Sequence, residues 1–246
     1  MKNEETIIFG IHPILEAINS GKEIDKLYIQ QDIKGPGLTE LRNAIKKHKI
    51  PFSHVPVFKL NKHVSGNHQG VIGFISPIAL HNIEQVIPTL FEQGKVPFVL
   101  ILDKVTDVRN FGAISRSAAC AGVDAIVIPS RESAQINADA IKTSAGALNH
   151  IPVCKVQNLT DTVLFLKASG LKIVSCTEKS SDTIYDVDYT SPTAIIMGGE
   201  EKGISNQLLK NSDARVKIPI VGEISSLNVS VAAGIVLFEA AKQRLI

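Results

Sequence analysis

Residues 97–112 read PFVLILDKVTDVRNFG, and the apolar run Phe98–Leu102 in this stretch is followed at once by polar residues. Continuous Val- and Ile-rich runs that alternate with helical segments are typical of a parallel sheet covered by helices on both faces. We therefore predict an α/β fold for this part of the chain. The apolar runs are Phe98–Leu102, Ala125–Ile128, Ile151–Val156, Leu171–Val174, Ala194–Met197 and Val216–Ile220.

Ligands of such sheets bind outside the carboxyl ends of the strands, which directs attention to the loops after Leu102, Met197 and Ile220. None of these loops carries the Gly-x-Gly-x-x-Gly turn of dinucleotide-binding domains. The sequence GGEEKG at 198–203 also lacks the Gly-Lys-Ser/Thr ending of a phosphate-binding loop. A nicotinamide dehydrogenase and a phosphate-loop NTPase are therefore both disfavoured.

The residues before 77 show a second, smaller α/β pattern. Helical spacing is expected over His12–Asn19 and Leu38–His48, and short strands over Ile7–Phe9, Lys26–Gln30 and Val71–Ile75. The pattern of apolar residues changes at 78–96. Prolines flank this stretch, and polar residues interrupt its apolar ones. We expect a small domain at 1–77, a linker with a short helix at 78–96, and a larger domain at 97–246.

Composition sets wide limits on function. A chain of 246 residues with 44% hydrophobic and 20% charged residues is typical of a globular protein, and its net charge of +2 permits nucleic-acid binding without demanding it. The three cysteines, Cys120, Cys154 and Cys176, fit neither a disulfide framework nor a metal site. Because no apolar run is long enough for a signal peptide or a membrane span, we expect a cytoplasmic protein.

Three segments carry the candidate chemistry. In Asn110–Gly122, Asn110 is expected to cap a helix of small residues, and Arg116 is either a salt-bridged surface arginine or a guanidinium that holds a phosphate. In Ala194–Ile204 a buried strand ends in two glycines, which allow close approach of a ligand, and then in Glu200; the alternative is an ordinary turn with a solvated acidic pair.

The third segment, 216–235, places Ser226 and Asn228 where an apolar-periodic helix begins. Both residue types cap helices well, and capping is compatible with ligand contact. The buried stripe of this helix is expected to contain Val229, Ala233, Val236, Leu237 and Ala240.

The order of these segments resembles the three sequence motifs of the SpoU (TrmH-like) family of RNA ribose 2′-O-methyltransferases, and the resemblance covers essentially the whole chain. It is greatest to the type that methylates guanosine in 23S rRNA, especially over 225–232. The residues up to 77, with Asn67–Val71 near their end, look like that family's substrate-binding domain, which is similar to the ribosomal protein L30e fold. The resemblance implies a SPOUT-type parallel sheet with a C-terminal trefoil knot, the cofactor S-adenosylmethionine and a homodimer.

Matched position by position, the resemblance implies active-site roles for Asn110, Arg116, Glu200, Ser226 and Asn228. It also implies contacts of S-adenosylmethionine with Gly198, Ile218 and Leu227, and it implies no metal. RNA backbone contacts are expected at lysines of the first domain, with a solvated helix end as the alternative. His68 is either a structural histidine or a substrate contact. The lysines are Lys46, Lys47, Lys59 and Lys62, with His48, Lys49 and His63 beside them.

The expected reaction transfers a methyl group to a ribose hydroxyl, which must lose its proton. Because arginine holds its proton at neutral pH, we expect Arg116 to hold a phosphate and stabilise the forming alkoxide, while the phosphate or Glu200, through a water, accepts the proton. Two alternatives remain: a tRNA ribose methyltransferase, and a catalytically inactive RNA-binding or ribosome-assembly protein. The first domain favours rRNA, and the intact set of Arg116, Glu200 and Asn228 argues against an inactive protein.

Overall fold

A computed structural model describes residues 7–200, 202–224 and 226–245 of the chain. The chain divides into two compact units. The first comprises Met1–Ala79 and Ile136–Ala138, and the second Leu80–Gln135 and Asp139–Ile246. Within the described ranges, no helix has the length and apolar character that crossing a membrane requires.

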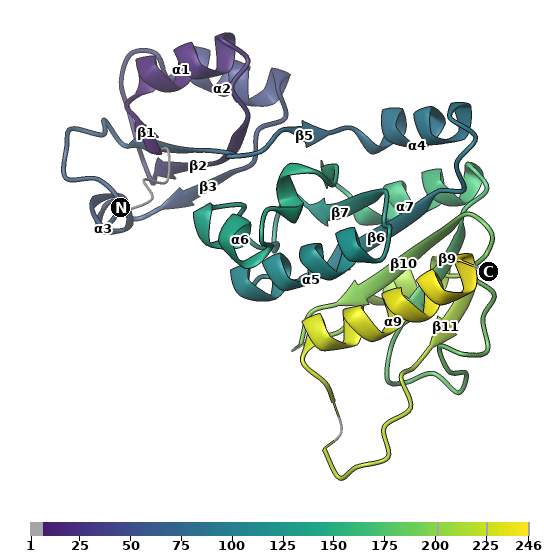
Figure 1. Cartoon of the computed structure of the whole chain (residues 1–246). Coiled ribbons are helices and arrows are strands. Elements are labelled where there is room, and N and C mark those ends of the chain that lie inside the picture. Colours follow the sequence, from purple (N-terminus) through teal and green to yellow (C-terminus); the bar gives the residue numbers. More distant parts are fainter. Residues whose placement is uncertain (1–6, 201, 225, 246) are drawn as a thin grey trace. The chain divides into compact units, whose positions relative to one another are not determined.

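The first unit is built on a four-stranded sheet with strand order β1-β4-β2-β3, in which only β2 and β3 are parallel. Helices α1 and α2 share one apolar core on one face of this sheet, and α3 covers a separate core on the other face (Figure 1). Strand β3 and helix α3 were not expected from the sequence. The elements are β1 (Ile7–Phe9), α1 (Ile11–Asn19), β2 (Ile24–Gln30), α2 (Leu38–Lys47), β3 (Phe52–Val55), α3 (Val57–Asn61) and β4 (Val71–Ile75).

The second unit is a seven-stranded parallel sheet with strand order β11-β9-β10-β6-β7-β8-β5. The chain runs outward from β6 through β7 to β8 and then returns to the other side, so that β6 and β10 are neighbours at the point where the order reverses. Ligands of open α/β sheets bind at such a switch point. The strands are β5 (Leu80–His81), β6 (Phe98–Asp103), β7 (Ala125–Pro129), β8 (Val153–Val156), β9 (Lys172–Cys176), β10 (Thr193–Gly198) and β11 (Ala214–Val216).

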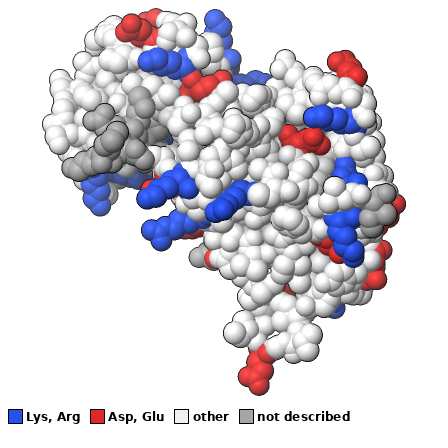
Figure 2. Space-filling model, in the orientation of Figure 1, with Lys and Arg blue, Asp and Glu red and all other residues white. Residues whose placement is uncertain are grey.

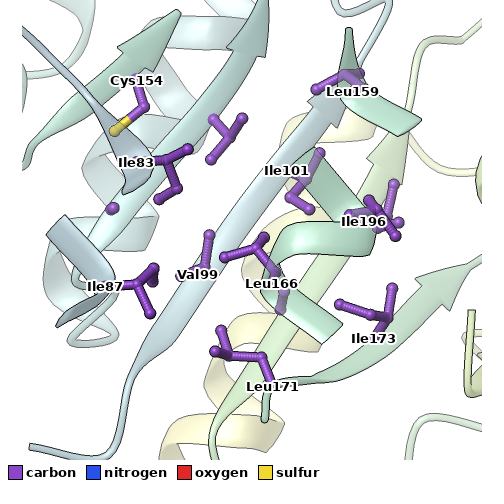
Figure 3. Close-up of a cluster of buried hydrophobic side chains, with 14 of the residues drawn as sticks. Ile83, Ile87, Val99, Ile101, Cys154, Leu159, Leu166, Leu171, Ile173 and Ile196 are labelled. Carbon is purple, nitrogen blue, oxygen red and sulfur yellow. The ribbon is translucent and has the colours of Figure 1, made fainter. Parts of the chain in front are cut away.

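Helices cover both faces of this sheet, as predicted. One face packs Val99 and Ile101 of β6 against α4, α7 and α8 (Figure 3). On the other face α9 packs against α5 and β10 (Figure 1). The predicted buried stripe of α9 is confirmed. The helices are α4 (Ile83–Glu92), α5 (Val108–Cys120), α6 (Ala138–Thr143), α7 (Leu159–Ala168), α8 (Asn206–Asn211) and α9 (Val229–Arg244), with a 3₁₀ turn at Ala147–Asn149.

Two segments differ from expectation. Residues 78–96 contribute β5, which pairs with β8, and α4, whose Ile83 and Ile87 belong to the core of the second unit. The strand expected over Val216–Ile220 lies upstream, at Ala214–Val216, with one further bridge from Lys217 to Thr183. Pro219 has no N–H to donate to a sheet ladder, which is consistent with the early end of this strand.

Arg244 connects the last turn of α9 to the segments that precede β6 and β10. Its guanidinium donates to the carbonyls of Tyr189 (2.7 Å), Ser191 (3.0 Å) and Val96, and lies 4.8 Å from the centre of the Phe98 ring. Replacing Arg244 with Ala is expected to lower the free energy of unfolding by about 2 kcal/mol, because charge-assisted hydrogen bonds are lost. Chemical denaturation measures this, and Lys210→Ala, at an exposed position of α8, is the control. An unfolding free energy equal to that of the wild type would contradict the assignment.

Candidate active site

The carboxyl end of β6 holds the loop after β10 through the backbone and the buried carboxylate of Asp103. Gly198 pairs with Asp103, and the N–H of Gly199 donates to the Asp103 carbonyl at 2.8 Å. The Asp103 side chain is 4% exposed, and its Oδ2 accepts from the N–H of Ser205 at 2.7 Å. The loop after β10 is thus held at both of its ends against the end of β6.

The two glycines of this loop allow backbone segments to touch. A Cβ atom on Gly198 would lie 2.3 Å from the carbonyl carbon of Gly203, and one on Gly199 would lie 2.3 Å from the carbonyl oxygen of Lys104. The sequence predicted glycine here for the close approach of a ligand. The closest neighbours at both positions are instead parts of the protein backbone, so glycine is required for the loop to form at all.

A polar cluster of Asn110, Glu200 and Asn228, here called the Glu200 cluster, stands at this junction. Glu200 Oε1 accepts from Asn110 Nδ2 at 3.1 Å, from Asn228 Nδ2 at 2.9 Å and from the N–H of Val229 at 3.5 Å. Asn228 Nδ2 also donates to Asn110 Oδ1 at 3.0 Å. Among the described residues, Oε2 of Glu200 has no hydrogen-bond partner, so this oxygen is available to a ligand.

Helix caps explain how the two asparagines reach Glu200. Asn228 is the N-cap of α9, as predicted, and accepts from the N–H of Ser230 at 2.9 Å. The prediction that Asn110 caps the helix that follows it is wrong: α5 begins at Val108, and Asp107 is its cap, accepting from the N–H of Asn110 at 2.7 Å. Because Asp107 serves as the cap, the carboxamide of Asn110 is free to bind Glu200.

Two cavities meet at the Glu200 cluster. The larger has a volume of about 390 Å³, within the usual range for small-molecule sites, and the smaller about 250 Å³. They share Gly199, Glu200, Lys202 and Val229. The larger is also lined by Cys176–Lys179, Met197, Gly198, Gly203, Ile204, Ile218, Ile220, Ser226, Leu227 and Ala232, and the smaller by Lys104–Asp107, Asn110 and Glu132.

All three residues expected to bind the cofactor line the larger cavity, and so does Ser226. The three are Gly198, Ile218 and Leu227. Within the described part of the chain, the N–H groups of Ile218 and Leu227 form no hydrogen bond. Burial raises the pKa of the Cys176 thiol to about 12, with Glu178 adding to the effect, so this cysteine stays a neutral thiol. The cavity therefore offers apolar walls and free backbone donors, without a reactive thiolate.

Arg116 is not brought into the Glu200 cluster. It is exposed and lines neither cavity, and it forms no ion pair or hydrogen bond in the described structure, so the alternative of a salt-bridged surface arginine is not observed. It follows Asn110 by six residues on α5. On an α-helix this places it about 9 Å farther along the axis and about 120° away around it.

Two residues that were not among the predicted site residues line the smaller cavity, and both have an unusual backbone conformation. Lys104 and Glu132 have φ angles of 60° and 55°, in the left-handed region. Non-glycine residues adopt this region rarely, and such positions gather at functional sites. Lys104 follows a buried strand directly, which was a usable signal; nothing in the sequence around Glu132 marks it.

The candidate RNA-binding lysines fall into two separate pairs. Lys46 and Lys47 end α2, and Lys59 and Lys62 lie in and directly after α3, on the opposite face of the first sheet. Figure 2 likewise shows Lys and Arg dispersed over the visible face rather than in one patch. His68 is held structurally: Nδ1 accepts from the N–H of Gly70 at 2.9 Å, and Nε2 is 2.8 Å from Asn61 Oδ1.

Comparisons with known proteins agree with this geometry. The SpoU rRNA Methylase family matches residues 97–238, and the RNA 2′-O ribose methyltransferase substrate-binding family matches residues 7–80. A Staphylococcus saprophyticus protein assigned to the TrmH family of tRNA/rRNA methyltransferases is 36% identical over 241 residues, covering 98% of this chain and 97% of its own.

Solved structures share the fold. The SpoU methyltransferase AviRb from Streptomyces viridochromogenes, in complex with AdoMet, superposes with a TM-score of 0.61 at 23% identity, covering 97% of this chain and 90% of its own. The A. aeolicus TrmH/SpoU tRNA modifying enzyme is 32% identical, covering 66% of this chain and 84% of its own, with a TM-score of 0.56. Since the SpoU methylase match alone spans more than half of the chain and the relatives extend over nearly all of it, this protein belongs to the SpoU (TrmH) family of RNA methyltransferases.

Proposed function

We propose that this protein transfers a methyl group from S-adenosylmethionine to the 2′-hydroxyl of a guanosine in 23S rRNA. The observation that carries the proposal is the Glu200 cluster, which stands between two cavities with one carboxylate oxygen free. The larger cavity would hold the cofactor and the smaller one the acceptor nucleoside. This arrangement would place a proton acceptor between the methyl donor and the hydroxyl that receives the methyl group.

The larger cavity fits S-adenosylmethionine in its chemistry. Met197, Ile218 and Leu227 offer apolar surface to an adenine ring, and the free N–H groups of Ile218 and Leu227 suit its ring nitrogens. Glu178 and Thr177 offer oxygens to the ribose hydroxyls. When bound, the cofactor supplies an electrophilic methyl group on a sulfonium.

Glu200 accepts the proton of the ribose in this scheme. Its Oε1 is held by three donors, which fixes the carboxylate and would leave Oε2 to take the 2′-hydroxyl proton, directly or through a water. Asn110 and Asn228 orient Glu200. Ser226, in the wall of the larger cavity, donates to the reacting ribose.

Arg116 holds the phosphate next to the acceptor ribose and stabilises the forming alkoxide. Because it is exposed and distant along α5 from the Glu200 cluster of its own chain, we assign it to the site of a partner subunit in a homodimer.

Arg116→Ala and Glu200→Gln should each be nearly inactive. A mixture of the two variants refolded together should regain about a quarter of wild-type activity, because half of the dimers are then mixed and each mixed dimer contains one intact site of its two. No recovery in mixed dimers would place Arg116 in its own chain's site.

The proposal extends to the architecture. Lys217 exchanges backbone hydrogen bonds with Asp182 and Ile184 (2.8 and 2.9 Å), so the chain after β11 runs beside the segment that precedes β10, as a C-terminal trefoil knot requires. We propose a knotted domain at 97–246 and an L30e-like RNA-binding domain at 1–77, with 78–96 joining them and contributing β5 and α4 to the larger sheet. We also propose a cytoplasmic location.

Cofactor binding and substrate choice test the proposal. S-adenosylmethionine is expected to raise the melting temperature progressively with its concentration, and labelled methyl is expected to enter unmodified 23S rRNA rather than 16S rRNA or tRNA. Label in tRNA alone would keep the chemistry and change the substrate. No thermal shift and no label in any RNA would favour an RNA-binding protein without activity.

A further inference from the structure

One stretch of the first unit is strongly basic although the whole chain is nearly neutral. Between Glu40 and Glu84 there is no Asp or Glu, while the same residues include six Lys or Arg. The net charge of +2 conceals this, because acidic residues elsewhere balance the six cations. These cations are divided between the α2 side and the α3 side of the first sheet, and Lys59 and Lys62 contribute positive potential on the α3 side. The six are Arg42, Lys46, Lys47, Lys49, Lys59 and Lys62.

Helix α3 lies within this stretch and presents a phenylalanine to solvent. The Phe58 side chain is 61% exposed, whereas Leu60, two residues later, is fully buried in the core under α3. Positions four apart share a helix face, so Lys62 follows Phe58 on the same side. An exposed aromatic ring therefore lies beside exposed Val57 in α3, with Lys59 next to it in the chain and Lys62 one turn later.

Tyr28, which packs against the core under α3, holds two ammonium groups on this side of the first sheet. The Nζ atoms of Lys26 and Lys59 each lie 4.8 Å from the centre of the Tyr28 ring. That ring is itself fixed by edge-on packing against Phe74, with centroids 5.1 Å apart. Cation–π contacts of this kind limit the motion of the lysines while leaving their N–H donors free for a ligand.

We propose that the α3 surface, formed by Lys26, Phe58, Lys59 and Lys62, binds an unpaired nucleotide of structured RNA. The base stacks on the Phe58 ring, and the lysines contact the flanking phosphates. The inference rests on RNA being the substrate, as proposed above, and adds which structural feature of the RNA is recognised and by which residues. A fully paired helix offers no free base face to Phe58, whereas a bulge or loop does.

Binding to two hairpin RNAs tests this: one has a single unpaired purine in its stem, and the other is identical but fully paired. Wild-type full-length protein is expected to bind the first more tightly, and Phe58→Leu is expected to weaken binding of that RNA alone, by about fivefold to a hundredfold. Lys59→Ala is expected to weaken both RNAs and to reduce the salt slope by about one. Phe91→Leu, at a ring 40% exposed on α4 of the other unit, is the matched control.

Equal loss of both RNAs in Phe58→Leu, or no loss of either, would overturn the proposal. Dissociation of a dimer by Phe58→Leu in sedimentation, with RNA binding unchanged, would assign the surface to a second copy of the chain instead. The assay needs no cofactor, so it is independent of methyl transfer. Selective binding of the RNA with the unpaired purine, without any methyl transfer, would support the α3 surface and refute the proposed activity. Methyl transfer without selective binding would support the proposed activity and refute the α3 surface.

Discussion

Replacing Glu200 with Gln is expected to lower the turnover number for methyl transfer by about 10²- to 10⁴-fold, the usual contribution of a general base. The substitution keeps the shape of the side chain and an oxygen that can accept from Asn110 and Asn228, but removes the negative charge that takes the ribose proton. The dissociation constant of S-adenosylmethionine should change little, because apolar walls and backbone groups provide most of the proposed contacts.

Steady-state kinetics together with calorimetric titration of the cofactor separate these effects. Glu223→Gln is the matched control, since Glu223 is an exposed acid in the loop before α9 and lines neither cavity. Turnover of the Glu200 variant within a few-fold of the wild type would show that the proton goes elsewhere, and the RNA phosphate would then be the remaining acceptor.

Replacing Gly198 with Ala is expected to abolish cofactor binding and to destabilise the second unit. The added methyl group would lie 2.3 Å from the carbonyl carbon of Gly203 and 2.4 Å from the N–H nitrogen of Ile204. Neither backbone atom can move aside as a flexible side chain would, and Gly203 is tied back to Gly199 by a 2.9 Å hydrogen bond. The loop that carries Glu200 must therefore shift, and overpacking of this kind costs about 1–3 kcal/mol or more.

The melting temperature and the cofactor affinity of Gly198→Ala measure the two consequences. Gly222→Ala is the matched control, because a Cβ atom there meets nothing within 4 Å. If Gly198→Ala bound S-adenosylmethionine as the wild type does, the loop after β10 would not form the wall of the cofactor cavity.

Most strands of the second unit could be predicted because continuous Val and Ile runs carry a strong signal, and the site followed from the rule that ligands bind at the carboxyl ends of strands. Weaker elements were not predictable. Helix α3 has only five residues, too few to show a period, and the apolar side chains of α4 are interrupted by polar ones, so the stretch 78–96 resembled a linker. The first residue of α5 was not predictable either, because Asp107 and Asn110 both belong to residue types that cap helices well.

Site geometry was predictable only in part. Gly198, Ile218 and Leu227 do line one cavity, but the hydrogen bonds of Glu200 to Asn110 and Asn228 join residues 90 and 28 positions apart, which no local pattern encodes. Arg116 shares a sequence motif with Asn110, yet helix geometry separates the two side chains. Lys104 and Glu132 were missed because their left-handed backbone is a property of the fold rather than of the residue type.

The most direct test of the central claim is the chemical position of the transferred methyl group. Labelled RNA from the reaction of S-adenosylmethionine with 23S rRNA is hydrolysed with alkali, which needs a free 2′-hydroxyl, and the products are identified by mass spectrometry. Ribose methylation by the Glu200 cluster predicts label in an alkali-resistant dinucleotide containing 2′-O-methylguanosine, and its loss in Glu200→Gln. Label that appears only in base-methylated mononucleotides would contradict the account.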